Sequence, residues 1–181
     1  MANIQLTRGL VTLTTIVRGL AIVGAVALCV VPAAFWLTRD WVSARGGYIT
    51  GIGNHPMVLD DRAMLLGACS SLPGVALGLF ALWQVWCLFG EYAQGRVFAP
   101  TAQRHLRRFA WGVLVLALIT PFLRAAMGVA LTLGNPPGQR LLALGFSWDD
   151  YINILCAAVL LAVATVMNEA VHLAEENDSF V

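Results

Sequence analysis

Apolar residues along this chain gather in four long blocks with shorter polar segments between them. The blocks cover about residues 18–38, 63–90, 110–133 and 151–173. The shortest holds 21 residues, and a helix of that length crosses the roughly 30 Å hydrocarbon layer of a bilayer. Within each block the apolar residues are nearly continuous instead of recurring on one helical face. The pattern predicts an all-α polytopic membrane protein, a four-span transmembrane helical bundle forming a single domain over residues 1–181.

The polar segments predict two further elements. Before the first block, apolar residues recur at three- and four-residue steps, at Leu6, Leu10, Leu13 and Val17. This spacing predicts a short amphipathic N-terminal helix at the membrane interface, leading into the first span. In the loop over residues 39–62, the stretch YITGIGNHPMVLD has turn residues from Gly53 to Pro56. That stretch indicates a short hairpin.

The distribution of arginine indicates how the chain crosses the membrane. All eleven basic residues are Arg. Four spans place both termini and loop 91–109 on one side with six arginines, and loops 39–62 and 134–150 on the other side with four. Because positive charge favours the cytoplasmic side, we expect both termini and loop 91–109 to be cytoplasmic. Trp and Tyr residues near both ends of the predicted spans give the two aromatic belts that this topology requires.

Composition and motifs narrow the classes of function. The chain is 59% hydrophobic and 12% charged, whereas soluble domains have about 25% charged residues. A net charge of +1, without a basic face that carries aromatics for base stacking, argues against direct nucleic-acid binding. The four cysteines, at positions 29, 69, 87 and 156, stand far apart along the chain, so they form no metal or redox pair in sequence. No motif for a nucleophile or for phosphate binding occurs, and we expect no enzymatic activity, catalytic residue or cofactor.

Histidine and carboxylate residues give two weak metal motifs. Glu169 and His172 stand three residues apart, as ligands do in di-iron bundles, but such sites need two motifs of this kind. The chain has three histidines and no second motif. His55 with Asp60 and Asp61 is better explained as the polar surface of a loop. We therefore expect no metal site.

The segment from Gly90 to Phe109 carries a dense group of arginines between two spans. A proline directly after Ala99 predicts a helix start. The apolar face of this helix holds Ala102, Leu106, Phe109 and Ala110. Its polar face holds Gln103, Arg104, Arg107 and Arg108, and Arg96 precedes it. We expect an amphipathic helix on the inner leaflet, where each Arg gains on the order of 1 kcal/mol from anionic lipid.

Together with the acidic C-terminal tail, these arginines form a candidate docking surface on the cytoplasmic face. The surface comprises Arg96, Arg104, Arg107, Arg108, Glu175, Glu176 and Asp178. Its arginines have three candidate partners, which are the anionic inner leaflet, an acidic cytoplasmic protein and the chain's own tail. The sequence leaves all three open.

Polar residues at the ends of the spans define an alternative function. At 1.5 Å per residue, Gln84 and Glu169 lie near the inner ends of their spans and Arg124 lies in the outer third. At mid-depth the spans carry only weakly polar groups, whereas ion and proton pathways usually need ionisable groups inside the bundle. The alternative is therefore a small-solute or ion transporter that acts as a homo-oligomer, with these three residues along its path.

The stretch LFGEYAQGRVFAPTAQRHLRRFAWGVL resembles the signature of a small bacterial membrane family, domain of unknown function 2975 (DUF2975). The matching positions are Tyr92, Gly95, Phe98 and Leu106. The C-terminal sequence AEENDSFV resembles the acidic close of the family, although Phe180 stands where a smaller residue is commoner. The resemblance covers roughly residues 65–181.

The resemblance implies a four-span protein of the bacterial cytoplasmic (inner) membrane without established chemistry. Members of this family are often encoded beside a small helix-turn-helix regulator. By association, this implies a membrane partner that restrains a soluble transcription regulator. We therefore expect a regulatory or scaffolding membrane subunit whose arginine segment and acidic tail make the contact.

Overall fold

Five helices make up the part of the chain that the structure describes. The computed structural model describes residues 8–178, apart from the side chains of residues 8, 10 and 172–178. The helices are α1 (Arg8–Leu37), α2 (Arg39–Thr50), α3 (Asp61–Ala93), α4 (Pro100–Thr132) and α5 (Trp148–Asp178). The four long helices, α1, α3, α4 and α5, are long and apolar enough to cross a membrane. The described residues contain no strand, so the all-α, four-span prediction is confirmed.

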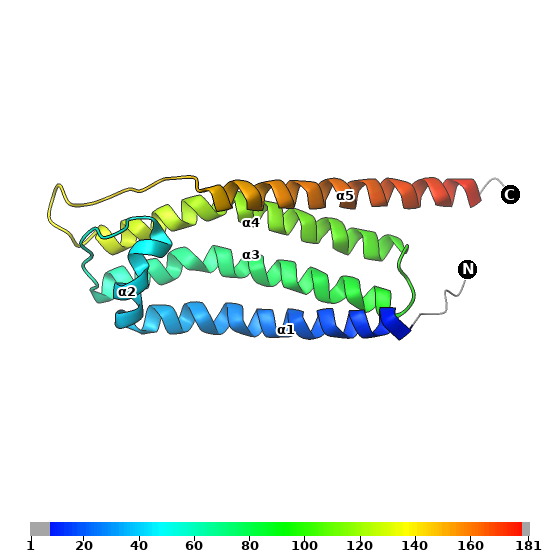
Figure 1. Cartoon of the computed structure of the whole chain (residues 1–181), viewed down its shortest axis with the longest axis horizontal. Coiled ribbons are helices and arrows are strands. Elements are labelled where there is room, and N and C mark those ends of the chain that lie inside the picture. The colour runs from blue at the N-terminus through cyan, green and yellow to red at the C-terminus, as the bar shows by residue number, and fades with distance from the viewer. Residues whose placement is uncertain (1–7, 179–181) are drawn as a thin grey trace.

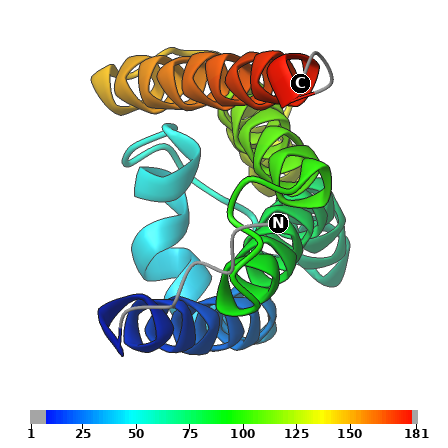
Figure 2. The ribbon, with the colours of Figure 1, turned by 90° about the vertical axis from the view of Figure 1, so that its right-hand side faces the viewer.

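The four long helices pack in the order α1, α3, α4, α5 (Figure 1). Each contacts the next, and among the described residues α5 packs against α4 alone. Viewed along the helices, the row is curved, with α1 and α5 at its two margins and α2 on its concave side (Figure 2). The bundle is therefore open between α1 and α5.

The helices divide the molecule into two ends. The start of α1, the turn between α3 and α4, and the end of α5 lie together at what we name the α3–α4 end (Figure 1). At the other end, named the α2 end, lie α2 and the long segment between α4 and α5. This division places the start of α1, the arginine segment and the end of α5 on one side of the predicted membrane, as four spans require.

Small residues set how closely the long helices approach. A Cβ atom at Gly67 of α3 would lie 2.2 Å from the ring of Trp36 in α1, and one at Gly78 would lie 2.5 Å from Leu28. On α5, Ala157 and Ala164 are 1% and 0% exposed. Their seven-residue spacing places them on one face of the helix, which packs on α4. Close helix contacts through small residues are typical of membrane proteins, in which burial of apolar surface drives no association.

A cluster of buried apolar residues lies at the α2 end. It consists of Trp36, Val42, Ile52 and Leu131, none more than 8% exposed. These residues come from α1, α2, the following loop and α4. The short helix α2 therefore packs against the end of the bundle, where it contacts α1 and α4.

The hairpin predicted in loop 39–62 is wrong. Residues 39–50 form α2, and residues 51–60 contain no strand. The glycines at 46 and 47 lie inside this helix. A Cβ atom at Gly47 would lie 2.0 Å from the carbonyl oxygen of Gly53. The N–H of Gly53 in turn donates to the carbonyl oxygen of Gly47 at 3.0 Å. Gly47 therefore lets the chain fold back across α2, which Gly51 ends in a left-handed conformation with φ 78°.

Two other boundaries also differ from the prediction. The short N-terminal helix expected before the first span is continuous with that span in α1. Of its expected apolar residues, Leu6 lies outside the described residues, and Leu13 is 52% exposed while Thr14 is 1% exposed. In a bilayer an apolar side chain gains little by facing protein instead of lipid. Similarly, loop 91–109 shortens to residues 94–99, because α4 runs without interruption from Pro100.

Candidate functional site

The turn between α3 and α4 is held by a carboxylate. Oε2 of Glu91 accepts hydrogen bonds from Nε of Arg96 at 2.8 Å and from the hydroxyl of Thr101 at 3.1 Å. Gly95 adopts a positive φ of 75°, and Pro100 opens α4 as its first residue, as predicted. The side chain of Arg96 is thus engaged inside the turn.

The remaining three arginines of the segment form one exposed face of α4. Arg104, Arg107 and Arg108 are all exposed, and their spacing of three and four residues places them on the same side of the helix. None of them has a hydrogen bond or ion pair with any side chain that the structure describes. The first turn of α4 contains no acidic residue, so the partial positive charge of the helix start adds to theirs. We name these three residues the arginine face.

Gln103 does not belong to this face, although it was predicted there. It is 1% exposed, and its Nε2 donates to the carbonyl of Val97 at 3.3 Å. Its Oε1 is buried without a hydrogen-bond partner in the described part of the chain. The side chain turns inward because it donates to a carbonyl of the turn before α4. The alternation of polar and apolar residues along the helix does not predict this hydrogen bond.

A polar pair joins α3 and α4 beneath the arginine face. Nδ1 of His105 and Oε1 of Gln84 are 2.8 Å apart, and Gln84 is 4% exposed. Because the amide oxygen can only accept, the ring nitrogen carries the proton. Gln84 therefore has a structural partner on the neighbouring helix.

The acidic half of the predicted docking surface lies at the end of α5. Glu175, Glu176 and Asp178 fall within the last turns of this helix, but their side chains are outside the described residues. The same holds for His172. Pairing of the tail with the arginine face stays a prediction. Glu169, just before these residues, is exposed.

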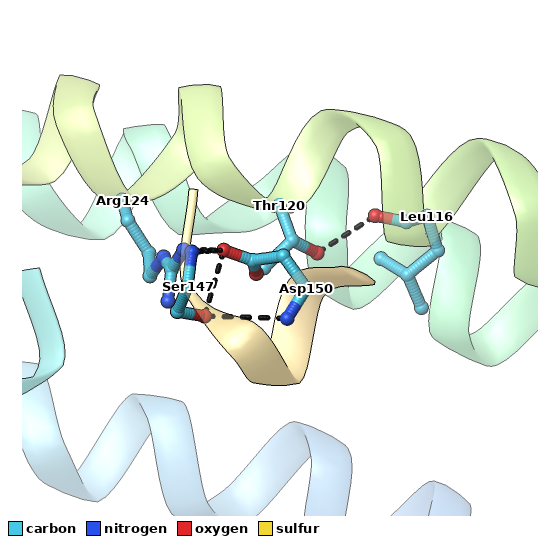
Figure 3. A network of polar contacts seen from close by, with 5 residues as sticks. All are labelled: Leu116, Thr120, Arg124, Ser147 and Asp150. Carbon is cyan, nitrogen blue, oxygen red and sulfur yellow. Dashed lines mark hydrogen bonds and ion pairs between the residues drawn. The ribbon is translucent and has the colours of Figure 1, made fainter. Parts of the chain in front are cut away.

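At the α2 end, Arg124 of α4 forms an ion pair with Asp150 at the start of α5 (Figure 3). The Asp150 side chain is 4% exposed and that of Arg124 is 28% exposed. Oδ2 of Asp150 also accepts hydrogen bonds from the backbone N–H of Ser147 at 2.7 Å and from its hydroxyl at 2.8 Å. In return, the N–H of Asp150 donates to the Ser147 hydroxyl at 3.2 Å.

This reciprocal arrangement is a capping box, with Ser147 before the helix and Asp150 three residues later. Sequence analysis missed it, although the signal was present in the order Ser-x-x-Asp directly before an apolar run. The carboxylate at the start of α5 also meets the partial positive charge of that helix. Arg124 therefore joins α4 to the start of α5.

The three residues of the alternative transport path do not lie together. Gln84 is bonded to His105, and Arg124 stands 19 residues after His105 on α4, roughly 28 Å away along the helix. Glu169 is exposed on α5, which packs against α4 only in the described part of the chain. Arg124 is therefore far from the Gln84–His105 pair along α4.

The loops at the α2 end also use their polar residues to join one another. Nε2 of His55 donates to the carbonyl of Gln139 at 2.8 Å. Asp60 caps α3 by accepting from the N–H of Ala63 at 2.8 Å, and Asp61 pairs with Arg39. Each member of the weak metal motif in this loop thus has a separate partner, and the described residues contain no group of metal ligands.

Comparison with known proteins gives one family. The profile of a family described as "Protein of unknown function (DUF2975)" matches residues 54–181. No curated protein and no solved structure matches the chain. The matched region contains α3, α4 and α5 and therefore includes both the arginine face and the Arg124–Asp150 pair.

Proposed function

The chain belongs to the DUF2975 family of proteins of unknown function, and we propose that it is a non-enzymatic membrane anchor or regulator that docks an acidic cytoplasmic protein. The arginine face carries the proposal. Three guanidinium groups lie on one side of a helix start, exposed and without partners among the described side chains.

Charge complementarity defines the partner. Three exposed arginines attract carboxylates across a surface and fix the register of a complex, and arginine binds carboxylate in a two-pronged geometry that lysine lacks. The α3–α4 end faces the cytoplasm in the topology that the arginine distribution predicts. The family resemblance implies a soluble helix-turn-helix regulator, in a bacterial inner membrane, as the first candidate to test.

A crosslinking experiment in cells tests this function. The parent protein is compared with the variant Arg104→Ala/Arg107→Ala/Arg108→Ala, after both are shown to insert at equal levels. A matched control, Arg39→Ala/Arg62→Ala/Arg140→Ala, removes as many charges at the α2 end. We expect a soluble acidic protein to crosslink to the parent and to the control, and to be lost from the first variant.

Two further results decide the meaning of that loss. Binding of the purified partner to the reconstituted protein must weaken as salt is raised, because exposed charges are screened. The same captured proteins in all three samples would show that the arginine face contacts anionic lipid instead, and the proposed docking function would be wrong.

A further inference from the structure

A cavity lies beneath α2, among the four helices at the α2 end. Its volume is about 510 Å³, within the range of about 300–1,000 Å³ in which proteins bind small molecules. Its walls come from α1, α2, α3 and α4 and are mainly apolar and aromatic. They include Trp36, Trp41, Ile49, Ser71 and Met127.

One charged residue lines this cavity. Arg45 projects from α2, is exposed, and has no hydrogen bond or ion pair with any residue that the structure describes. Two other arginines at this end, Arg39 and Arg124, each pair with an aspartate. The cavity therefore combines an apolar interior with a single uncompensated positive charge.

The cavity reaches from α2 to the third turn of α3. Arg45 belongs to the short helix at the end of the bundle, whereas Ser71 stands ten residues into α3, roughly 15 Å from its start.

The cavity lies on the side of the bundle where the described parts of α1 and α5 do not meet. α2 crosses the concave side of the row of helices, and α1 and α5 make no contact in the described part of the chain (Figure 2). Because α2 forms one wall of the cavity, the cavity lies on this concave side.

We propose that this cavity binds one anionic phospholipid from the leaflet at the α2 end. Its phosphate pairs with the guanidinium of Arg45, and one acyl chain occupies the space between Trp36, Ile49 and Met127. Arginine matches phosphate in a two-pronged geometry, and the tryptophans at 36 and 41 suit the boundary between head groups and acyl chains. The site is separate from the arginine face, which lies at the opposite end.

Lipid retention by purified protein tests the proposal. The full chain is reconstituted in vesicles of phosphatidylcholine and phosphatidylglycerol at a ratio of three to one, then extracted in mild detergent for native mass spectrometry. We expect one retained lipid, enriched in phosphatidylglycerol over the vesicle ratio. Arg45→Gln should lower that enrichment about fivefold, the factor that one arginine contributes at an anionic surface, and Arg45→Lys should keep most of it.

Two variants separate this site from general membrane electrostatics. Arg62→Ala removes an exposed arginine at the same end that does not line the cavity, so it should leave the enrichment unchanged. Ile49→Trp narrows the cavity from an exposed position of α2 and should reduce retention of both lipids. The proposal is wrong if the retained lipid matches the vesicle ratio, if a fatty acid is retained in place of phospholipid, or if Arg45→Gln has no effect.

Discussion

The Arg124–Asp150 pair at the α2 end and the arginine face at the α3–α4 end use arginine in different ways. At the α2 end, Arg124 is largely buried against Asp150, and Arg39 pairs with Asp61. At the α3–α4 end, the arginine face is exposed and unpaired among the described side chains. Arginine count alone predicts the direction of the chain through the membrane, but only the partners separate arginines that hold helices together from arginines that remain free to bind.

The ion pair at the α2 end should give the largest effect on stability. Asp150→Ala leaves the Arg124 guanidinium without its carboxylate and removes half of the cap of α5. Breaking a buried pair from one side costs about 3–5 kcal/mol, which we expect as a loss in the free energy of unfolding measured by denaturing-detergent titration. Asp149→Ala, an exposed neighbour in the same first turn, is the control and should change stability by less than about 1 kcal/mol.

Disrupting the close contact between α1 and α3 should have the second-largest effect on stability. Gly67→Ala places a methyl group against the ring of Trp36, and overpacking of this kind costs about 1–3 kcal/mol. Gly90→Ala, at the other end of α3, meets no atom within 4 Å. That control should gain up to about 1 kcal/mol from helix propensity. Equal effects of the two substitutions on thermal unfolding in detergent would contradict tight packing at the α2 end.

The polar pair at the α3–α4 end should contribute less. Gln84→Leu leaves the ring nitrogen of His105 without its acceptor, at an expected cost of about 1–2 kcal/mol in the same unfolding assay. The double variant Gln84→Leu/His105→Phe removes both polar groups and should recover most of this loss. If the double variant is as unstable as the sum of the two single variants, the hydrogen bond does not join the helices.

The arginine face should have the smallest effect on folding. Replacing all three of its residues by Ala removes no hydrogen bond or ion pair that the structure describes, so the free energy of unfolding should change by about 0.5 kcal/mol or less. Circular dichroism and the unfolding titration measure this directly. A loss of several kcal/mol would assign these arginines to the fold, as at the α2 end, and would remove the basis for docking.

The sequence predicts the spans well because length and continuous hydropathy determine them. It does not predict their order in space, since helices that are apolar on all sides give no periodic signal for a packing face. α2 was missed because Gly46 and Gly47 resemble turn residues. Their role depends on Gly53 returning across the helix, which is a contact between segments.

The candidate site was also predicted only in part. The arginine face follows directly from the spacing of its residues, while Asp150 was overlooked because its capping signal lies within a segment otherwise treated as a loop. The inward turn of Gln103 depends on the carbonyl of Val97 in the preceding turn. A residue's neighbours along a helix do not reveal that partner.

The open row of helices also bears on how the protein is made. Each long helix packs against the long helix that precedes it in the chain, and α5 requires only α4. A ribosome that releases the spans one by one therefore supplies each long helix after the first when the helix on which it packs is already present in the membrane. Assembly can keep pace with translation, and no finished contact between long helices has to open to admit a later one.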